Sequence, residues 1–344
     1  MTVHVALVGA GWVSLERHLP ALRSDRYVVV DGVVAPEPVL AGLSAELNLS
    51  ERATDLDAPW LDRVDAVMVG TPPPTHFDVV MRALERGKHV LVEKPFAATA
   101  DEATAMIGRA RDLNLQLGVV HNLQFCRAAR KAQQLLAAGK IGDLRGVVGL
   151  QSSNHRRRLP AWYRSLPLGL FTDESPHLIY LAQAFLGGAT VSNVSVGTPL
   201  GPDDNTPDVV SLNLRDDQGR PATIVNNFGG ALSEWALILL GSKATLVIDL
   251  FRDVLIKLPD DAGHVTKDVL RTSAAGIVGH VDGSIRSGFR RVFSSLDYGN
   301  AEVVHRFIAA VEGRGELGPI SAERGRDVVV VIDACHAAAQ RPSD

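Results

Sequence analysis

Short apolar runs alternate with segments of helical spacing over the first 120 or so residues. The runs are rich in β-branched residues and contain few polar positions, as expected of strands buried on both faces. They predict strands at residues 4–9, 28–35, 66–70, 89–93 and 115–120. Between them, helical spacing predicts helices at 14–23, 38–47, 75–86 and 100–112. Strands that alternate with helices indicate a parallel, doubly wound sheet.

The pattern changes after residue 122. A helix at 127–138 ends at Gly139, a good C-cap. Short polar turns such as RDDQGRP (215–221) then join a series of strands and favour antiparallel pairing. We expect these strands at 144–152, 191–198, 208–215, 221–228, 235–240, 244–250 and 253–258, and further helices at 174–186, 300–312 and 322–340. Residues 261–297, rich in Gly, Ser and Arg, are predicted to form a long loop.

The length of 344 residues suits two domains. We expect an α/β protein with an N-terminal doubly wound Rossmann domain at 1–121. Residues 122–344 are predicted to form an α+β domain with a large, mainly antiparallel open sheet, which binds substrate and supports oligomerisation. The C-terminal helix at 322–340 is a candidate to pack back on the first domain.

Composition narrows the range of partners. The chain has 46% hydrophobic and 22% charged residues, which is typical of a globular protein, and its net charge of -4 provides no basic surface for nucleic acid. The N-terminus starts with an apolar strand and lacks the features of a secretory signal, and no apolar run reaches the roughly 20 residues that span a bilayer. We therefore expect a cytoplasmic protein that binds neither nucleic acid nor membranes.

The two cysteines, Cys126 and Cys335, lie too far apart in sequence to form a zinc or redox motif. No metal site and no disulfide framework are expected. Cys335 is predicted to be a buried helix residue, the usual place for a free cysteine.

A glycine turn follows the first predicted strand in VALVGAGWVS. Gly9 permits the tight turn, Gly11 lets backbone approach a pyrophosphate, and Ser14 is small enough for helix and strand to pack closely. Trp12 and Val13 open the helix, whose N-terminus offers unpaired N–H groups to phosphate. The turn predicts dinucleotide binding, with a merely structural turn as the alternative.

The acid that would hold an adenosine ribose is expected at the end of the second strand. That strand ends at Ala35, which is not acidic. Glu37 lies two residues later, and Asp31 lies earlier on the same face of the strand. Because no arginine follows to bind a 2′-phosphate, we expect NAD as cofactor, without excluding NADP.

The stretch VMVGTPPPTHFDVVMRALERGKHVLVEKPFA (67–97) resembles the GFO/IDH/MocA family of oxidoreductases, named for glucose-fructose oxidoreductase, inositol dehydrogenase and a rhizopine-catabolism protein. The two motifs that carry the resemblance are TPPPTH after one strand and GKHVLVEKP through the next. The resemblance continues through GKIGDLRGV (139–147) and weakens beyond residue 190. It implies cofactor contacts from Thr71, Pro72, Pro73 and His76, although His76 could equally cap the next helix or bind backbone.

By the same motif match, Glu93 would contact the cofactor ribose and Lys94 would hydrogen-bond the substrate oxygen. Pro95 would direct the backbone, often through a cis bond in such proteins. The role of Lys94 is chemically reasonable even without the resemblance. An amine of lowered pKa can take the proton of a substrate hydroxyl as hydride leaves the carbon that carries this hydroxyl. The alternative is an ordinary surface Glu–Lys pair at a strand end.

In FTDESPHLIY (171–180), Asp173 and His177 are four residues apart and share one face of a helix. The resemblance makes His177 an acid or base partner of Lys94 and makes Asp173 an orienting group; otherwise they form a surface pair. The sequence departs from the family pattern nearby. Of the usual glycine cluster only Gly169 remains, Ser175 and Pro176 stand where a glycine is common, and Tyr180 replaces a common acid.

The substrate pocket has weaker candidates. His121 and Asn122 end the last strand of the first domain, and SSNHRRRLPAWYR (152–164) supplies arginines and aromatic side chains that could bind an anion or stack on a sugar. A solvated loop is the alternative for this segment. The candidates in it are Arg156, Arg157, Arg158, Trp162, Tyr163 and Arg164, and Tyr298 is a further candidate for cofactor contact.

Together these features predict an NAD(P)-dependent enzyme that moves hydride between nicotinamide and a secondary alcohol or ketone of a sugar, cyclitol or nucleotide sugar. The resemblance also implies a homodimer or homotetramer. Two alternatives are an enzyme whose tightly bound NAD is only transiently reduced, such as an epimerase, lyase or glycosidase, and a non-catalytic cofactor-sensing protein.

Overall fold

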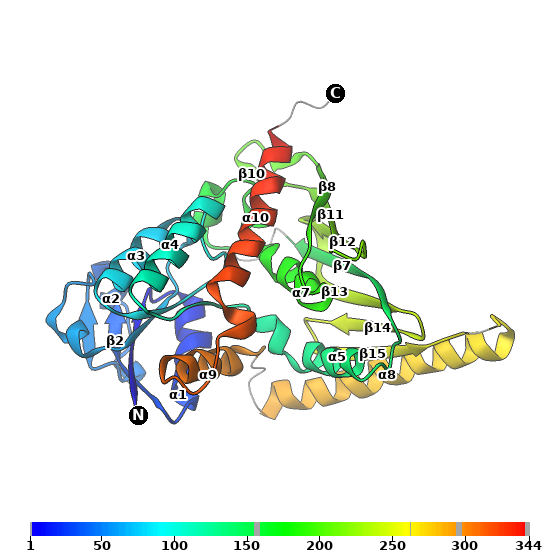
Figure 1. The fold of residues 1–344 in the computed structure, drawn as a ribbon, viewed down its shortest axis with the longest axis horizontal. Coiled ribbons are helices and arrows are strands. Elements are labelled where there is room, and N and C mark those ends of the chain that lie inside the picture. Colours follow the sequence, from blue (N-terminus) through cyan, green and yellow to red (C-terminus); the bar gives the residue numbers. More distant parts are fainter. Residues whose placement is uncertain (1, 155–158, 262, 294–297, 341–344) are drawn as a thin grey trace. The chain divides into compact units, whose positions relative to one another are not determined.

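The chain divides into two compact units in the computed structural model, which describes residues 2–154, 159–261, 263–293 and 298–340 (Figure 1). The first unit comprises Met1–Asn122 and Asn300–Val330, and the second comprises Leu123–Gly299 and Val331–Asp344. The division falls within the last helix, α10 (Ala322–Ala339).

A six-stranded parallel sheet forms the centre of the first unit, in the order β3-β2-β1-β4-β5-β6. Its strands are β1 (Val3–Val8), β2 (Val28–Val34), β3 (Glu51–Ala53), β4 (Ala66–Val69), β5 (His89–Val92) and β6 (Leu117–Val119). The predicted parallel Rossmann sheet is confirmed. The strand order reverses between β1 and β4, which is where ligands bind at the carboxyl ends of such sheets.

Helices cover the faces of this sheet and bury its apolar strands. The main ones are α1 (Leu19–Ser24), α2 (Glu37–Ala41), α3 (His76–Glu85) and α4 (Ala100–Asp112). Thr99 caps α4 by accepting a hydrogen bond from the N–H of Glu102. The segment predicted as one helix at 38–47 instead ends at Gly42 and restarts as a 3₁₀ turn at Ala45–Leu47.

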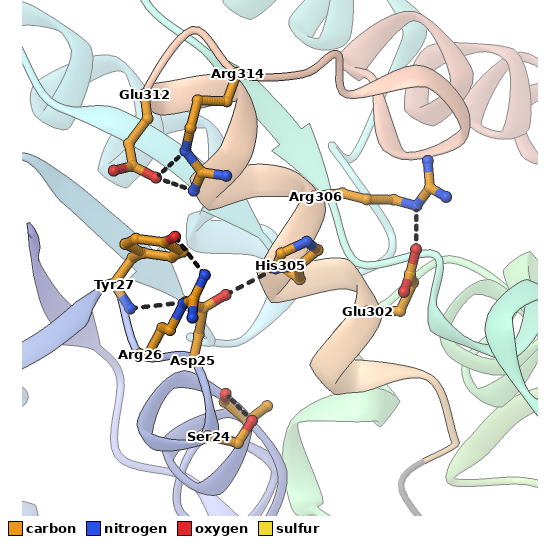
Figure 2. Close-up of polar contacts among 10 residues, drawn as sticks. Ser24, Asp25, Arg26, Tyr27, Glu302, His305, Arg306, Glu312 and Arg314 are labelled. Carbon is orange, nitrogen blue, oxygen red and sulfur yellow. Dashed lines mark hydrogen bonds and ion pairs between the residues drawn. The ribbon is translucent and has the colours of Figure 1, made fainter. Parts of the chain in front are cut away.

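The helix α9 (Asn300–Val311) belongs to the first unit although it follows the second unit in sequence. Its apolar face buries Phe307 and Ile308, which supplies the driving force for docking. Polar contacts then orient it, as Figure 2 shows for His305, whose Nδ1 lies 3.1 Å from Oδ2 of Asp25. Just beyond α9, the Arg314 guanidinium lies 4.4 Å from the centre of the Tyr27 ring.

The second unit is built on a seven-stranded sheet in the order β15-β14-β13-β7-β12-β11-β8. All neighbouring strands are antiparallel except β7 and β12, which run parallel, so the prediction of a mainly antiparallel sheet is confirmed. The strands are β7 (Leu144–Asn154), β8 (Thr190–Val196), β11 (Val209–Arg215), β12 (Pro221–Asn227), β13 (Gly229–Gly241), β14 (Ala244–Asp249) and β15 (Val254–Pro259). A separate two-stranded sheet pairs β9 (Pro199–Gly201) with β10 (Asp204–Pro207).

Helices pack on one face of this sheet. α7 (Pro176–Leu186) packs on β7, and α5 (Arg127–Ala137) packs on β14 and β15. Side chains alternate along β7, where Val147 and Gly149 face these helices and Leu150 stays exposed on the other face. Within the described ranges, no helix combines the length and hydropathy needed to cross a membrane.

The loop predicted at 261–297 is wrong, because most of that segment is the 28-residue helix α8 (Thr266–Phe293). Its glycines lowered the expected helix propensity. In the structure they let the helix approach β15 closely, since a Cβ built at Gly279 would lie 3.2 Å from the Ile256 side chain and one at Gly283 would collide with Val254. Tertiary packing therefore outweighs the local cost.

Candidate active site

The turn after β1 has the geometry that its glycines predict. Gly9 has a φ of +96°, and a Cβ there would lie 2.7 Å from the carbonyl oxygen of Gly70 at the end of β4, so no larger residue fits. At Gly11, in contrast, a Cβ would meet no atom within 4 Å. The backbone at Gly11 is thus open to a ligand, as a pyrophosphate site requires.

The helix that follows begins with an exposed Trp12, which is 65% accessible, and a partly exposed Val13. The Arg17 guanidinium lies 5.2 Å from the centre of the Trp12 ring. Residues Ser14–His18 form a π-helical turn, η1, a rare conformation that is frequent at functional sites. The buried Ser14 hydroxyl fills the space beside Gly70, where a Cβ would collide with it.

The same turn places His18 against the glutamate of the EKP segment. His18 is 1% exposed, and its Nε2 lies 2.8 Å from Oε1 of Glu93. The other carboxylate oxygen of Glu93 accepts a hydrogen bond of 2.9 Å from the backbone N–H of Lys94. Both oxygens of Glu93 are therefore engaged by the protein, and the Lys94–Pro95 peptide bond that follows is cis.

Opposing effects set the charge of Glu93. Burial would raise its pKa, but the contact with His18, together with the charge and backbone N–H of Lys94, holds the pKa below its ordinary value. Glu93 is consequently an anion at neutral pH. This anion lies directly beside Lys94, at the carboxyl end of β5.

His76 connects the two family motifs. It is fully buried, with Nδ1 2.8 Å from the carbonyl oxygen of Pro95 and Nε2 2.9 Å from that of Thr71. Burial lowers its pKa, opposed by these two carbonyls and by Glu93. Of the alternatives open for His76, the structure shows bonding to backbone. The neighbouring Pro72 and Pro73 lead into a 3₁₀ turn at Pro73–Thr75.

His121 ends the sheet beside this cluster. It is 2% exposed, and burial lowers its pKa to about 3 in spite of the opposing charge of Glu93. The ring is therefore neutral at physiological pH. Asn122 is half-buried and starts a 3₁₀ turn at Asn122–Phe125.

The second strand of the Rossmann domain ends at Val34, one residue before the expected Ala35, which is buried. Of the two nearby acids, Asp31 is buried and pairs with His4, whose Nδ1 lies 2.9 Å from Oδ2 of Asp31. Glu37 is exposed in the first turn of α2. Of these two acids, Glu37 is the one that is accessible from solvent.

In the second unit, Asp173 and His177 lie on either side of a helix junction. α6 (Leu170–Glu174) ends at Ser175, and Pro176 occupies the first turn of α7. The backbone ladder nevertheless continues through Ser175, which donates to Phe171 O at 2.9 Å and accepts from Ile179 N at 3.2 Å. The four-residue spacing therefore keeps Asp173 and His177 on one side, and both are half-exposed among buried neighbours.

Aromatic residues hold the His177 ring. Its Nδ1 lies 2.9 Å from the hydroxyl of Tyr180, which also accepts a hydrogen bond of 2.9 Å from the backbone N–H of Leu123. The Trp235 ring, from β13, lies 5.1 Å from the His177 ring between centroids. Tyr180 thus links the His177 ring to the backbone of Leu123.

Neighbouring residues stabilise this junction. Gly169, the retained glycine, has a φ of +50°, and a Cβ there would collide with Thr206, whose hydroxyl accepts from the N–H of Leu170 at 3.0 Å. Glu174 is buried and accepts hydrogen bonds of 2.8 Å from both Gln151 and Ser153.

The other substrate and cofactor candidates differ in accessibility. Tyr163 is buried and its hydroxyl donates to Asp204 at 2.6 Å, so it ties its turn to β10, whereas Trp162 is half-exposed. Tyr298 donates to the carbonyl of Phe251, within the second unit, at 3.3 Å. Arg156, Arg157 and Arg158 lie outside the described residues.

Sequence reasoning missed His18, and it noted Tyr180 only as a departure from the family pattern. His18 follows Ser14 by four residues, so it was predictable as a polar residue on the sheet-facing side of the first helix. Tyr180 follows His177 by three residues on α7, so their contact was predictable from helical spacing. The contact of Trp235 with His177 depends on tertiary structure and left no signal in the sequence.

Two family models match the chain. One, described as an oxidoreductase family with an NAD-binding Rossmann fold, matches residues 3–121, and the other, described as the GFO/IDH/MocA C-terminal domain, matches residues 129–247. Together they cover more than half of the chain. Among solved structures, levoglucosan dehydrogenase in complex with NADH has the same fold, with a TM-score of 0.78 at 20% identity over 98% of each chain.

Some curated relatives are named as sugar or cyclitol oxidoreductases, and others as oxidoreductases without a stated substrate. A 1,5-anhydro-D-fructose reductase of Ensifer adhaerens is 32% identical over 137 residues, which are 40% of this chain and 41% of that protein. An inositol 2-dehydrogenase of Rhizobium meliloti is 25% identical over 342 residues, which are 97% of this chain and 96% of that protein. The match thus spans less than two thirds of the first relative and nearly all of the second.

Proposed function

Because the chain belongs to the GFO/IDH/MocA family of NAD-binding oxidoreductases, we propose that it transfers hydride between nicotinamide and a secondary alcohol or ketone of a sugar, cyclitol or nucleotide sugar. The names of the relatives support this substrate class. The observation that carries the proposal is the engagement of Glu93 by His18 and by the Lys94 backbone, because it fixes the backbone that carries the Lys94 amine at the ligand-binding edge of the sheet.

The residues around the β1 turn fit a dinucleotide. The open backbone at Gly11 and the N-terminus of the helix after it would bind the pyrophosphate, and Thr71 would line the nicotinamide side. Glu37 would accept hydrogen bonds from the adenosine ribose hydroxyls. A carboxylate there repels a 2′-phosphate, so we propose NAD in preference to NADP. When bound, NAD supplies or accepts the hydride.

Lys94 would act on the reacting oxygen. As hydride leaves the substrate carbon, its hydroxyl proton passes to the Lys94 amine, and in the reverse direction the ammonium returns it. Both oxygens of Glu93 are engaged within the protein, so Glu93 would position Lys94, and its remaining acceptor capacity would serve the predicted contact with the cofactor ribose. His18 would act through Glu93 as a further positioning residue.

His177 would be the second group that handles this proton, with Asp173 orienting the substrate. The ring is held by Tyr180 and Trp235, as preorganised catalysis requires. We propose residues 122–344 as the substrate-binding and oligomerisation domain, with Trp162, His121 and Asn122 lining the pocket. His121, being neutral, would contribute hydrogen bonding rather than charge.

The test begins with binding of NADH and NADPH by the purified protein, measured separately by fluorescence of the reduced nicotinamide. Keto-sugars, keto-cyclitols and nucleotide keto-sugars are then screened for loss of nicotinamide absorbance. We expect tighter NADH binding and turnover of at least one class. Lys94→Ala should still bind NADH but lose about 10²–10⁴-fold in kcat/KM, whereas Lys131→Ala, which removes an exposed lysine on α5, should match wild type.

Two other outcomes of this test would indicate a different function. Turnover of a sugar without net change in free cofactor would indicate an enzyme with tightly bound NAD that is only transiently reduced. Cofactor binding without turnover in any substrate class, and with no effect of Lys94→Ala, would indicate a non-catalytic sensor.

A further inference from the structure

One face of α8 carries large apolar side chains that the second unit does not bury and that are exposed to solvent. Their exposed fractions exceed one half, whereas a helix that serves only the core would bury them. Along the centre of this face they are Leu270 at 64%, Ile277 at 66%, Val281 at 51%, Ile285 at 55% and Val292 at 77%, and Val278 at 65% and Phe289 at 63% lie beside them. Ala274 and Gly288 fill the intervening positions of the same stripe.

This apolar stripe lies opposite the face that packs on the sheet. The packing face carries Gly276, Gly279 and Gly283, which contact the side chains of β15. At about 100° per residue, Val281 lies about 200° round the helix from Gly279. The stripe is therefore not needed for packing within the second unit. Exposing this much contiguous apolar surface is unusual for a chain that stays alone.

The central row of the stripe, from Leu270 to Val292, has a spacing that is its own mirror image, while Val278 and Phe289 flank this row on one side. From Val281 the apolar positions lie four residues away at Ile277 and Ile285, and eleven residues away at Leu270 and Val292. Ala274 and Gly288, each seven residues away, complete the symmetry. A two-fold axis reverses helix direction, so the stripe of one helix would meet the same stripe of another in register. Leu270 would then face Val292, and Ile277 would face Ile285.

We propose that α8 pairs antiparallel with α8 of a second copy of the chain, with the two-fold axis at Val281. Such an isologous contact uses one patch twice, which is the commonest way to form a closed dimer. The eleven-residue spacing matches straight helices closely, so the contact can run along the roughly 42 Å of α8. The stripe has no charged member, and the nearby Asp282 already pairs with Arg286 at 2.8 Å in its own helix.

The first test is the mass in solution, measured by light scattering on a sizing column. We expect Val281→Arg to halve the mass of the wild-type assembly, because the axis would bring two arginines together. Val269→Arg is the matched control, since Val269 is 43% exposed but lies about 120° round α8 from Val281. A monomeric wild type at tens of micromolar, or an unchanged mass for Val281→Arg, would overturn the proposal.

The second test places a thiol on the axis. Val281→Cys should form a disulfide-linked dimer under mild oxidation, while Val269→Cys should not. The native Cys126 and Cys335 are buried and will not interfere. No cross-link at Val281, or equal cross-linking at both positions, would overturn the antiparallel pairing. Binding of α8 to anionic vesicles, abolished by Val281→Arg while the protein stays monomeric, would assign the stripe to a membrane surface instead.

Discussion

Tyr180 determines how His177 is held, because its phenol hydroxyl contacts the imidazole ring directly. The hydroxyl bridges the His177 ring and the backbone of Leu123. A phenol orients an imidazole without placing an anion beside it. The proposed proton chemistry in this protein therefore depends on ring position more than on a charged partner.

Tyr180→Phe tests this role. Loss of the hydroxyl should free the His177 ring and lower kcat by about tenfold, with little change in KM, because positioning acts on the reacting state. The same substitution in a His177→Ala background should have almost no further effect on kcat. Steady-state kinetics of the four proteins would measure this coupling. Equal losses in both backgrounds would mean that Tyr180 acts on folding and not through His177.

His121 gives stability a defined dependence on pH. Burial lowers its pKa to about 3 from the ordinary 6.5. Below pH 6.5, His121 therefore binds a proton in the unfolded chain but not in the folded protein. The contribution of His121 to the free energy of unfolding is thus fully present above pH 6.5. This contribution decreases by about 1.4 kcal/mol per pH unit as the pH falls toward about 3.

His121→Asn should therefore lose less free energy of unfolding on acidification than wild type, even if it is less stable at neutral pH. Urea denaturation at a series of pH values between neutrality and about 4 would measure the two slopes. His264→Asn, at an exposed histidine, is the control. Parallel curves for wild type and His121→Asn would show that His121 titrates in the folded protein as it does in the unfolded chain.

Among the elements, α8 shows why glycine content alone led to the wrong prediction of a loop. Gly276 has room for a methyl group, with the nearest atom of Leu258 3.6 Å from a built Cβ, whereas a Cβ at Gly283 would collide with the buried Val254. Gly276→Ala should raise the free energy of unfolding by about 0.5–1 kcal/mol through helix propensity. Gly283→Ala should lower it, and thermal or chemical denaturation would decide. Equal stabilisation by both would contradict the close packing of α8 on β15.

Most strands were predictable because their apolar, β-branched runs carry the signal themselves, as in β1, β4 and β5. β3 has only three residues, too few to show a period. The parallel pairing of β7 with β12 joins strands about 75 residues apart, so short turns could not reveal it. Propensity also failed for α8, whose glycines are explained only by the sheet beneath them.

The site was predictable where chemistry is concentrated in short motifs. The glycine turn and the EKP segment indicated Gly9, Gly11, Glu93 and Lys94 as candidates, and their roles stay predictions. His18 was missed because its partner Glu93 lies 75 positions later in the chain, and no local pattern links a buried histidine to a distant carboxylate. That Glu93 contacts the cofactor ribose stays a prediction, and our proposal adds that Glu93 positions Lys94.

For the molecule as a whole, the proposed activity requires groups from both units to act on one substrate oxygen. Lys94 belongs to the first unit and His177 to the second. If both handle the same proton, removing either should disable the same step. Residues that act as a unit are strongly non-additive, and this property can be measured without knowing how the units are arranged.

The most direct test is a double-mutant cycle on hydride transfer, followed as single-turnover loss of nicotinamide absorbance with saturating cofactor. The four proteins are wild type, Lys94→Ala, His177→Ala and the double variant. We predict that the double variant is scarcely slower than the slower single variant. Rate losses that simply multiply, with both single variants still binding NADH normally, would show that Lys94 and His177 do not serve one proton and would contradict the proposal.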